Sequence, residues 1–525
     1  MRRIFVTVAV LAVQLAVLRV MAASYYVDGG NSSASDSNSG SSSSPWKTIG
    51  KANLSVSPGD TVYIKQGTYN EGITPRMSGT ASQRITYQNF GTDKVLITET
   101  TRGILLVGRS YITVQGIDFY HLDGFMWLES ATNNTIAYCK FDVMRSSSQW
   151  TGSRIRKGSR YNWIHHCQFS KWGYYTTDDE NVVLDIGDEY STTDQTSFNL
   201  LEDCVLFHGG HHVLGIYGSF NVIRRNYFHN ENWSSGHGDR NIMMHGYDSN
   251  SGNNLIEHNR IAFSGEPPDD VGSSGMALIT KKNIVRFNYF YQNNTPGIMM
   301  GIVDEYFTVP CFNKIYNNTF HHNGYNPIAG SEKKSAIGFA VWTGTKQIVS
   351  NAVVNNLFWD HIKSYGTYNV NLADQRIEGN WEQTSDPKFV DVTSPVSPTN
   401  SSLPDLTLRS GSPCIDTGVH LAKVTSSSGS GTSFRLNDAG YFCDGWGIIE
   451  GDTIQFAGTT QRAQITRIDT TTQTVTVDRS VTWTQNQGVS MAYEGSAPDR
   501  GAFEYGGATK PSPPSNLRIT QASPN

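Results

Sequence analysis

The chain has 525 residues, too many for one ordinary compact domain, so a repeat architecture or several domains is expected. Lys and Arg number 41 against 46 Asp and Glu, giving a net charge of −5 without a basic tract, which argues against nucleic acid as a partner. Only 17% of the residues are charged, while Gly numbers 50, Tyr 25 and Phe 23. This composition is typical of a turn-rich all-β protein.

Residues 1–23 have the pattern of a secretory signal peptide. Basic residues precede an apolar run from Ile4 to Val17, and the small residues Ala22 and Ala23 follow it. No later stretch stays apolar over the roughly 18 residues that a membrane helix needs. We therefore expect a secreted protein, extracellular or periplasmic, that does not associate with a membrane.

A short repeat runs through the middle of the chain. An Asn is followed two residues later by an apolar residue, three later by Asn or Cys, and two later by another apolar residue. Eight copies begin 22 to 38 residues apart, at Asn134, Asn162, Asn199, Asn221, Asn254, Asn283, Asn313 and Asn351. A fixed core with connections of varying length predicts a parallel β-solenoid, in which each coil adds short strands to stacked sheets and its loops bulge outward.

The second polar position of the repeat predicts an interior column. Asn226, Asn259, Asn288, Asn318 and Asn356 occupy it, and their amides should bond to one another about 4.8 Å apart from coil to coil. Cysteines hold the same position in three earlier coils and are expected to form a buried stack of thiols: Cys139, Cys167 and Cys204. In an exported protein Cys414 could also pair with Cys443.

Motifs at both ends of the repeat resemble known proteins. The N-terminal motifs are Pro45-Trp46-Lys47-Thr48-Ile49, Pro58-Gly59-Asp60-Thr61-Val62 and Gly67-Thr68-Tyr69-Asn70-Glu71, and the closing ones are Ser412-Pro413-Cys414-Ile415-Asp416 and Pro498-Asp499-Arg500-Gly501-Ala502-Phe503-Glu504-Tyr505. They resemble secreted right-handed parallel β-helix proteins of the pectate-lyase-like superfamily. The resemblance covers roughly residues 24–505 and implies a glycan-active protein, without specifying its chemistry.

The chain divides into five segments. After the signal, residues 24–418 are expected to form a right-handed parallel β-helix with an N-terminal cap. Residues 419–497 lose the Asn repeat, become rich in Thr and Gly, and predict a small β-domain inserted near the C-terminus. Residues 498–507 would close the β-helix, and residues 508–525 combine a Pro-rich linker with the start of a truncated module that looks like fibronectin type III.

Unusual side chains follow one strand of each coil. Aligning these strands places Asp185, Tyr217, His245 and Lys281 on consecutive coils, in what would be one outward ladder. Histidines concentrate in the same region, and several of them have no place in the repeat. We take His245, Tyr217, Lys281 and Arg240 as the candidate catalytic residues. The candidate substrate-binding residues are His211, His212, Lys157, Trp233 and Trp342.

Acidic residues crowd the coil around Asp185. Asp178, Asp179, Asp185 and Asp188 are the candidate metal ligands, since such carboxylates suit Ca²⁺, the candidate cofactor. A transition-metal site built on histidines is a weaker alternative.

Two mechanisms fit these residues. A lyase needs a base, a proton donor and a cation or amide that neutralises a uronate carboxylate, and Lys281, His245, Tyr217 and Arg240 or calcium can fill these roles. A hydrolase needs two carboxyl groups about 5–9.5 Å apart. No such pair stands out among its candidates Asp185, Asp239, Asp248, Asp304 and Glu305.

The strand before Lys281 is similar to the one that carries the lysine base in chondroitinase B-like and alginate lyases of this fold. Apolar Ala277 and Ile279 stand where those enzymes have acidic metal ligands. We expect a secreted, monomeric lyase that cleaves a uronate-containing polysaccharide by β-elimination. A glycoside hydrolase and a non-catalytic glycan-binding surface protein are the alternatives.

Overall fold

The computed structural model describes residues 22–145, 151–170, 182–230, 240–246, 251–265, 273–302, 308–392 and 404–507. The expected signal peptide is therefore almost wholly outside the described residues, as is the expected linker. None of the described helices is long and apolar enough to cross a membrane.

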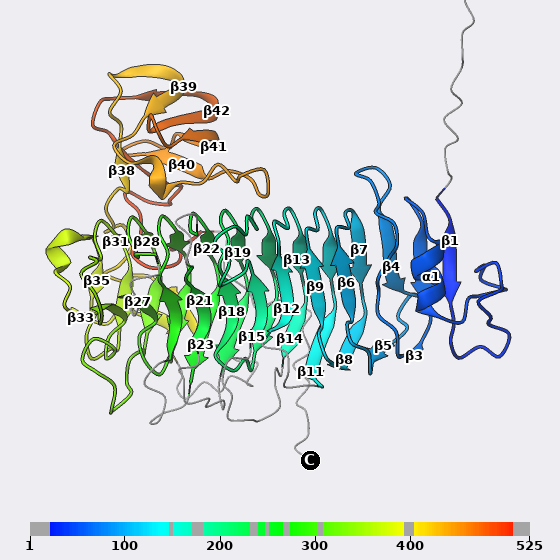
Figure 1. Ribbon diagram of the computed structural model, residues 1–525. Helices are drawn as coiled ribbons and strands as arrows, with labels where there is room; N and C mark the ends of the chain where they lie inside the picture. Colours follow the sequence, from blue (N-terminus) through cyan, green and yellow to red (C-terminus); the bar gives the residue numbers. More distant parts are fainter. Residues whose placement is uncertain are drawn as a thin grey trace, which may run out of the picture.

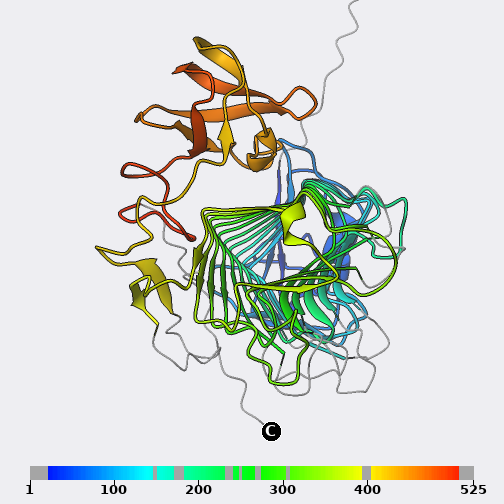
Figure 2. The same cartoon turned by 90° about the vertical axis from the view of Figure 1, so that its left-hand side faces the viewer.

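Within the described residues, three parallel sheets wind into a solenoid (Figures 1 and 2). The first sheet consists of β1 (Ser24–Val27), β2 (Thr61–Ile64), β4 (Ile85–Asn89), β7 (Ile112–Gln115), β10 (Thr135–Ala137), β13 (Trp163–His165), β16 (Leu200–Glu202), β19 (Val222–Arg224), β22 (Leu255–Glu257), β25 (Ile284–Arg286), β28 (Lys314–Tyr316), β31 (Ala352–Val354) and β34 (Arg376–Glu378).

The second sheet consists of β3 (Gly67–Tyr69), β5 (Val95–Thr98), β8 (Asp118–Leu122), β11 (Lys140–Met144), β14 (Gln168–Ser170), β17 (Val205–Phe207), β20 (Tyr227–Asn230), β23 (Arg260–Ser264), β26 (Tyr289–Tyr291), β29 (Thr319–His321), β32 (Leu357–Trp359) and β35 (Trp381–Glu382). The third sheet consists of β6 (Ile104–Val107), β9 (Met126–Glu129), β12 (Thr151–Arg156), β15 (Val182–Ile186), β18 (His212–Ile216), β21 (Arg240–Met244), β24 (Ser274–Leu278), β27 (Ile298–Ile302), β30 (Ile337–Val341) and β33 (Tyr365–Tyr368). The predicted right-handed parallel β-helix is confirmed.

The predicted asparagine column is present inside the solenoid. Asn259 donates from Nδ2 to Oδ1 of Asn288 at 3.0 Å, and Asn288 donates in the same way to Asn318 at 3.0 Å. Each Oδ1 also accepts a backbone N–H from the preceding coil, so the column satisfies turn amides that the sheets do not reach. The first Asn of the repeat forms a second column of the same kind, for example between Asn283 and Asn313 at 2.9 Å.

The cysteines of the earlier coils continue the first of these columns. Cys167 donates its backbone N–H to Sγ of Cys204, and the backbone N–H of Cys204 donates to Oδ1 of Asn226 at 2.9 Å. All six cysteines of the chain are free thiols, so the suggested disulfide between Cys414 and Cys443 is wrong. These two residues are buried in separate apolar clusters, Cys443 on the side of the inserted domain and Cys414 against the second sheet.

The N-terminal end of the solenoid is covered by a short helix, α1 (Ile49–Ser55). The side chain of Thr48 caps it by accepting the N–H of Lys51 at 3.0 Å, and Ile49 and Ala52 are buried against the first coils. The Pro45–Ile49 motif thus leads into a helix that caps the apolar interior at the N-terminal end of the solenoid, where the described residues include no preceding coil.

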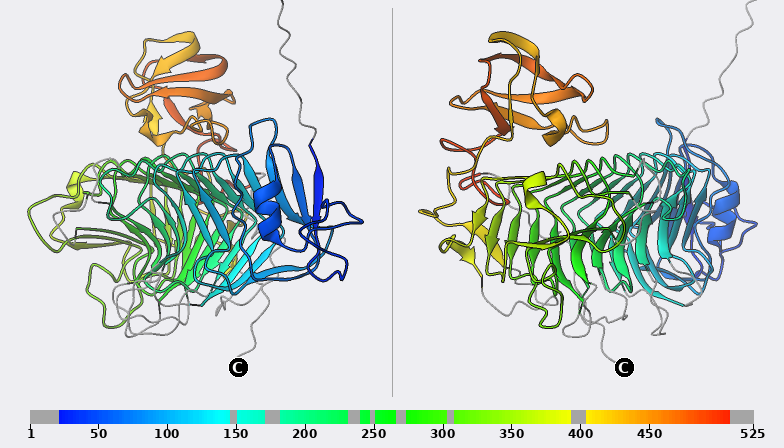
Figure 3. Two further views of the ribbon diagram at one scale, coloured as in Figure 1. Left: turned by 45° about the vertical axis from the view of Figure 1, so that its right-hand side comes forward. Right: turned by 60° about the vertical axis from the view of Figure 1, so that its left-hand side comes forward.

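A small antiparallel domain stands on the outside of the last coils (Figures 1 and 3). It contains β38 (Ala422–Lys423), β39 (Gly429–Arg435), the 3-10 helix η2 (Ala439–Tyr441), β40 (Thr453–Phe456), β41 (Arg462–Asp469), β42 (Thr474–Trp483) and β43 (Gly488–Met491). The 3-10 helix η1 (Leu372–Asp374) connects β33 and β34 within the last coil of the solenoid. Between the solenoid and the small domain the chain forms an antiparallel pair of β36 (Phe389–Asp391) and β37 (Asp405–Leu408). The predicted small β-domain near the C-terminus is confirmed.

The closing motif ties the chain back onto the solenoid. The side chain of Asp499 accepts the N–H groups of Asp416 at 2.7 Å and Tyr505 at 2.6 Å, and Glu504 accepts the N–H of Asp499 at 3.0 Å. Asn317 reaches from the solenoid to the carbonyl of Asp499 at 2.9 Å. The motif therefore consists of two acids that bind backbone amides in a partly buried turn.

Glu504 should make stability depend on pH. Burial and the nearby Asp499 raise its pKa to about 8, and its Oε2 is buried without a hydrogen-bond partner in the described structure. Because the folded protein holds this proton more tightly than the unfolded chain, the stabilisation is complete below pH ~4.5 and is lost as the pH rises through about 8. Thermal melts at pH 5 and pH 9 give the free energy of unfolding at each pH. Between these two pH values it should fall by on the order of 3–5 kcal/mol more in the wild type than in Glu504→Gln. Exposed Glu450→Gln is the control, and an equal pH dependence in Glu504→Gln would contradict the assignment.

Candidate functional site

The strand register corrects the ladder expected from the sequence. Asp185 pairs with Gly215, and Gly215 pairs with Met243, so these residues share one outward row of the third sheet. Tyr217 directly follows β18 and His245 directly follows β21, two residues beyond that row. Asp185 is therefore not in register with Tyr217 and His245, because the alternation of buried and outward residues, and not the distance from the Asn repeat, sets the row.

Lys281 lies outside the third sheet. It forms an isolated bridge with Gly252 at the corner before the first sheet, three residues after β24 ends. The single ladder predicted through Lys281 is wrong for this reason. Lys281 and Tyr217 do line one groove, which is described below.

Tyr217 and His212 form a buried pair beside Asp185. The hydroxyl of Tyr217 lies 2.9 Å from Nε2 of His212, and that nitrogen lies 3.6 Å from Oδ1 of Asp185. Gly215 makes this approach possible, because a Cβ there would lie 2.3 Å from Oδ1 of Asp185 and 2.7 Å from the Tyr217 hydroxyl. Burial and the charges of Asp185 and Glu189 raise the pKa of Tyr217 well above its ordinary value. The phenol is therefore neutral and can donate a proton.

His245 lies on the other side of Tyr217. Their ring centroids are 5.2 Å apart in an edge-to-face arrangement, and Nε2 of His245 lies 3.0 Å from Oε1 of Glu189. Burial acts to raise the pKa of Glu189, but the hydrogen bond and charge of His245 hold it below its ordinary value. An ionised Glu189 fixes the orientation of the His245 ring.

Arg240 and His211 complete this group. Nη1 of Arg240 lies 2.9 Å from Nε2 of His211, and Nδ1 of His211 lies 3.2 Å from Nδ1 of His212. We call this group the histidine–tyrosine cluster; it consists of Asp185, Glu189, His211, His212, Tyr217, Arg240 and His245. The structure thus brings together three of the four predicted catalytic residues, two of the predicted binding residues and one predicted metal ligand.

A second charged group lies one strand away on the same sheet. The guanidinium groups of Arg102 and Arg154 lie 3.5 Å and 4.2 Å from the ring centroid of Trp127, and Arg156 lies 5.8 Å from it. Arg154 pairs in register with Asp185. Burial and the neighbouring charges of Arg156 and Arg102 lower the pKa of Arg154. We call these four residues the arginine cluster.

The arginine cluster has unused donors. The Arg156 side chain donates to Oε1 of Glu129 at 2.8 Å, whereas the guanidinium of Arg154 makes no hydrogen bond within the described residues. Nε1 of Trp127 is likewise buried without an acceptor there. A cationic group with free donors on an outer sheet face suits an anionic ligand.

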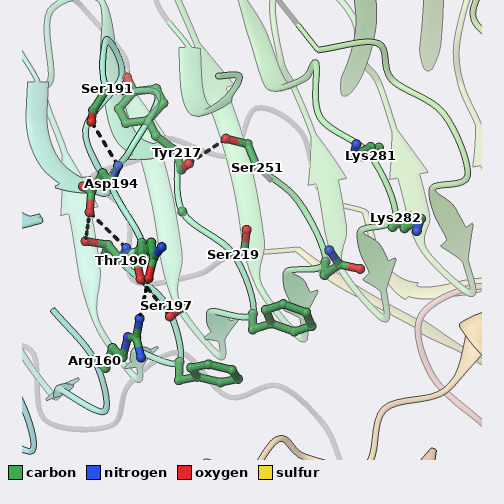
Figure 4. A pocket seen from close by; sticks show the side chains of 15 residues that line it. Arg160, Ser191, Asp194, Thr196, Ser197, Tyr217, Ser219, Ser251, Lys281 and Lys282 are labelled. Carbon is green, nitrogen blue, oxygen red and sulfur yellow. Dashed lines mark hydrogen bonds between the residues drawn. The ribbon is translucent and has the colours of Figure 1, made fainter. Parts of the chain in front are cut away.

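An open groove of about 470 Å³ lies beside Tyr217 (Figure 4). Ser251 donates to the carbonyl of Tyr217 at 2.8 Å on one side of it, and Lys281 stands beyond Ser251 (Figure 4). On the opposite side the carboxylate of Asp194 accepts from the Thr196 hydroxyl at 2.8 Å. The groove is therefore lined with hydroxyl, amide and charged groups, which suit a ligand rich in hydroxyls.

The other predicted binding residues lie away from Tyr217 or outside the described chain. Nζ of Lys157 bonds Oε2 of Glu129 at 2.5 Å. Trp342 follows β30 and covers Gly301, and β30 is four strands from β18, about 19 Å at ~4.8 Å per strand. Trp233 lies outside the described residues.

The calcium site stays a prediction. Asp178 and Asp179 lie outside the described residues, and Oδ2 of Asp188 lies 3.8 Å from Nη1 of Arg156. Asp185 faces His212. Among the described residues no three His, Cys, Asp or Glu gather around one point, so those residues alone do not make a calcium site.

Sequence reasoning missed the arginine cluster and the role of Glu189. Arg102, Trp127 and Arg154 belong to different coils and share no motif, so only the strand register brings them together. Glu189 directly follows the candidate metal ligand Asp188, but its carboxylate pairs with His245. The hydrolase candidates Asp239, Asp248, Asp304 and Glu305 all lie outside the described residues.

Comparison with known proteins agrees with the fold. Residues 25–189 match the family model for the Pel9A-like, right handed beta helix region. This confirms the resemblance to parallel β-helix proteins of the pectate-lyase-like superfamily. Uncharacterized protein YwoF of Bacillus subtilis (strain 168) is 36% identical over 63 residues, which are 12% of this chain and 14% of that protein.

Similar solved structures include lyases and a hydrolase. Pectate lyase Pel9A is 16% identical, with 92% of this chain and 96% of that chain covered and a TM-score of 0.46. A GH136 lacto-N-biosidase from Eubacterium ramulus is 10% identical, with 68% of each chain covered and a TM-score of 0.41. A rhamnogalacturonan lyase is 17% identical, with 74% of this chain and 94% of that chain covered and a TM-score of 0.39.

Proposed function

We propose that the protein is a secreted polysaccharide lyase that cleaves a uronate-containing glycan by β-elimination. The observation that carries this proposal is the position of the Tyr217–His212 pair at β18 two strands from Arg154 of β12, with Asp185 of β15 between them, on the outer face of one sheet. A proton donor, nearby imidazoles and unused cationic donors are the groups that this reaction requires. The export pattern in residues 1–23 supports secretion.

Each group has a role in the proposed reaction. His245, oriented by Glu189, takes the proton on the carbon next to the uronate carboxylate. The electron pair of that C–H bond forms the new C=C bond, and the C–O bond of the glycosidic linkage breaks. Tyr217 gives its proton to the leaving oxygen and is reprotonated from solvent through its contact with His212, while His245 releases the proton it took to solvent, so that both groups return to their starting states.

Arginines supply the charge that favours the carbanion-like intermediate. Taking a proton from the carbon next to a carboxylate spreads more negative charge onto that carboxylate. Arg154 has free donors beside Asp185, and Arg240 is held by His211 on the other side. Either guanidinium can bind the carboxylate in a bidentate manner.

A panel of uronate and neutral polysaccharides tests the proposal. Polygalacturonate, alginate and xylan would be incubated with the full chain, with added calcium and separately with EDTA. We expect near-ultraviolet absorbance from unsaturated ends on an acidic polymer. New reducing ends without absorbance would indicate a hydrolase. No product from any polymer of the panel would favour glycan binding. Activity that is lost in EDTA and returns with calcium would support the calcium prediction.

A further inference from the structure

A second cavity lies where the inserted domain meets the solenoid. It has a volume of about 580 Å³, and we call it the interdomain cleft. Its lining combines aromatic rings with charged and hydroxyl groups; the residues that matter here are Phe220, Lys282, Phe312, Lys314, Asp438 and Trp446. The groove beside Tyr217 shares Phe220, Asn253 and Lys282 with the cleft. The two cavities therefore run into each other along one corner of the solenoid.

The corner residues have left-handed backbone conformations that aromatic side chains rarely adopt. Phe220, Lys282 and Phe312 have φ values of 56°, 58° and 58° at the same position of their coils. Asn253 occupies the same position in its coil with φ 56°. Asn is one of the residue types that adopt this left-handed conformation readily. Aromatic residues there cost backbone strain, so the rings need a separate explanation.

Packing explains some of these rings but not Phe312. Phe198 and Phe220 stack at 5.3 Å with an interplanar angle of 12°, and Trp446 of the inserted domain meets Phe220 edge-on at 5.3 Å. Phe312 is 49% exposed and has no ring partner among the described residues. A strained, exposed and unstacked ring is a feature of ligand platforms.

The spacing along the corner fits an extended chain. Phe220 and Phe312 are three coils apart, about 14 Å at ~4.8 Å per coil, with Asn253 and exposed Lys282 between them. Lys282 has no ion pair within the described chain. The faces of a sugar ring carry C–H groups that pack on aromatic rings, while its hydroxyl and carboxylate groups suit the amide and the ammonium.

The walls of the cleft are fixed by buried contacts. Arg286 of β25 binds both carboxylate oxygens of Asp452 at 2.6 Å, and the Tyr316 hydroxyl donates to the carbonyl of Tyr441 at 2.7 Å. Nζ of Lys314 bonds Oδ2 of Asp438 at 2.6 Å, and both residues line the cleft. Because the inserted domain is docked this firmly, the cleft is formed before any ligand arrives.

We propose that the interdomain cleft is a second binding site for the acidic polysaccharide, continuous with the groove beside Tyr217. The inference rests on the proposed function for the choice of an acidic polymer. Phe312 and Trp446 would hold sugar faces, and Lys282 would bind a carboxylate. The inserted domain then serves to hold a long chain while cleavage occurs on the third sheet.

Affinity electrophoresis of the full chain tests this site apart from catalysis. The variants are made in a Tyr217→Phe background, in which the proposed cleavage should be about 10²–10⁴ times slower, and the gels contain polygalacturonate, alginate or xylan. We expect Phe312→Ala to raise the dissociation constant about tenfold for the polymer that retards the parent protein. Lys282→Met should weaken binding of the acidic polymers only. Tyr138→Ala is the matched control, since Tyr138 has φ 53° and is 51% exposed on another corner.

The outcomes separate the cleft from the proposed reaction. Equal retardation of the Phe312→Ala and Lys282→Met proteins and their parent overturns the cleft, even where the wild type releases unsaturated product. Loss of retardation in Phe312→Ala supports the cleft, even where no polymer is cleaved and the lyase proposal fails. A parent that none of the three polymers retards overturns the cleft as well. Melting curves of each variant confirm that the comparison is between folded proteins.

Discussion

Tyr217→Phe is expected to reduce turnover on the acidic polymer by about 10²–10⁴ while the protein keeps its fold. The substitution removes only the hydroxyl that lies 2.9 Å from Nε2 of His212 and keeps the ring that packs against His245. In the proposed reaction, the leaving glycosidic oxygen then has no proton donor. The measurement is the initial rate of absorbance from unsaturated ends, at polymer concentrations that separate kcat from KM.

The matched control is Tyr289→Phe. Tyr289 is 1% exposed in the second sheet, and its hydroxyl has no hydrogen-bond partner within the described structure. Loss of the Tyr289 hydroxyl should leave kcat unchanged. The two variants therefore distinguish an effect specific to the Tyr217 hydroxyl from the general effect of removing a buried tyrosine hydroxyl. A wild-type rate in Tyr217→Phe on a confirmed substrate would remove Tyr217 from the mechanism and direct attention to the acids from Asp178 to Glu189 and from Glu266 to Asp270.

The raised pKa of Tyr217 predicts one feature of the dependence of the reaction rate on pH. Burial and the charges of Asp185 and Glu189 raise the pKa of Tyr217, so its hydroxyl stays protonated beyond pH ~10. The rate should therefore not fall on the alkaline side through ionisation of Tyr217.

The sequence predicts the solenoid well because the interior repeats. Each Asn of the columns donates from Nδ2 to the next coil and accepts at Oδ1 from the preceding coil, so the residue type is required at that position in coil after coil. A periodic requirement of this kind is visible without coordinates. The continuation of the columns to Gln375 and Asn380 was missed, because the one coil that holds both residues no longer carries the full motif.

The site is harder to predict because it does not repeat. Its residues come from single coils separated by loops of different lengths, so no count along the chain gives their row in the third sheet. Asp185 and Lys281 fell outside the expected ladder for this reason, whereas Tyr217 and His245 stayed together because each directly follows its strand. The arginine cluster depends on register alone, and nothing in the spacing of Arg102 and Arg154 indicates it.

A buried ion pair that sequence reasoning did not find joins the inserted domain to the solenoid. The Arg286 side chain is 2% exposed and that of Asp452 is 5% exposed, and two hydrogen bonds of 2.6 Å join them. Arg286 also bonds Oε2 of Glu257 at 2.7 Å, and Asp452 accepts the N–H of Cys443 at 2.8 Å. The two residues are far apart in sequence and belong to different domains, so the sequence around one of them gives no indication of the other.

Asp452→Ala should destabilise the docked domain by about 3–5 kcal/mol, because it leaves a buried guanidinium with one carboxylate and a backbone amide without an acceptor. Calorimetry should then show an early transition for the inserted domain, ahead of the solenoid. Asp452→Asn keeps one acceptor and should lose less. The control is Glu494→Ala, which breaks an exposed pair with Arg462 and should change little.

Limited proteolysis shows where the loss of stability acts. If the ion pair holds the domain in place, cleavage within residues 419–497 should appear in Asp452→Ala at temperatures where the solenoid stays intact. The same variant should lose the polymer retardation attributed to the interdomain cleft, because Trp446 of the inserted domain then no longer has a fixed place in the lining of the cleft. A single unshifted transition with unchanged cleavage would show that the apolar contacts of Tyr441 and Phe442 with the first sheet are sufficient to dock the domain without the ion pair.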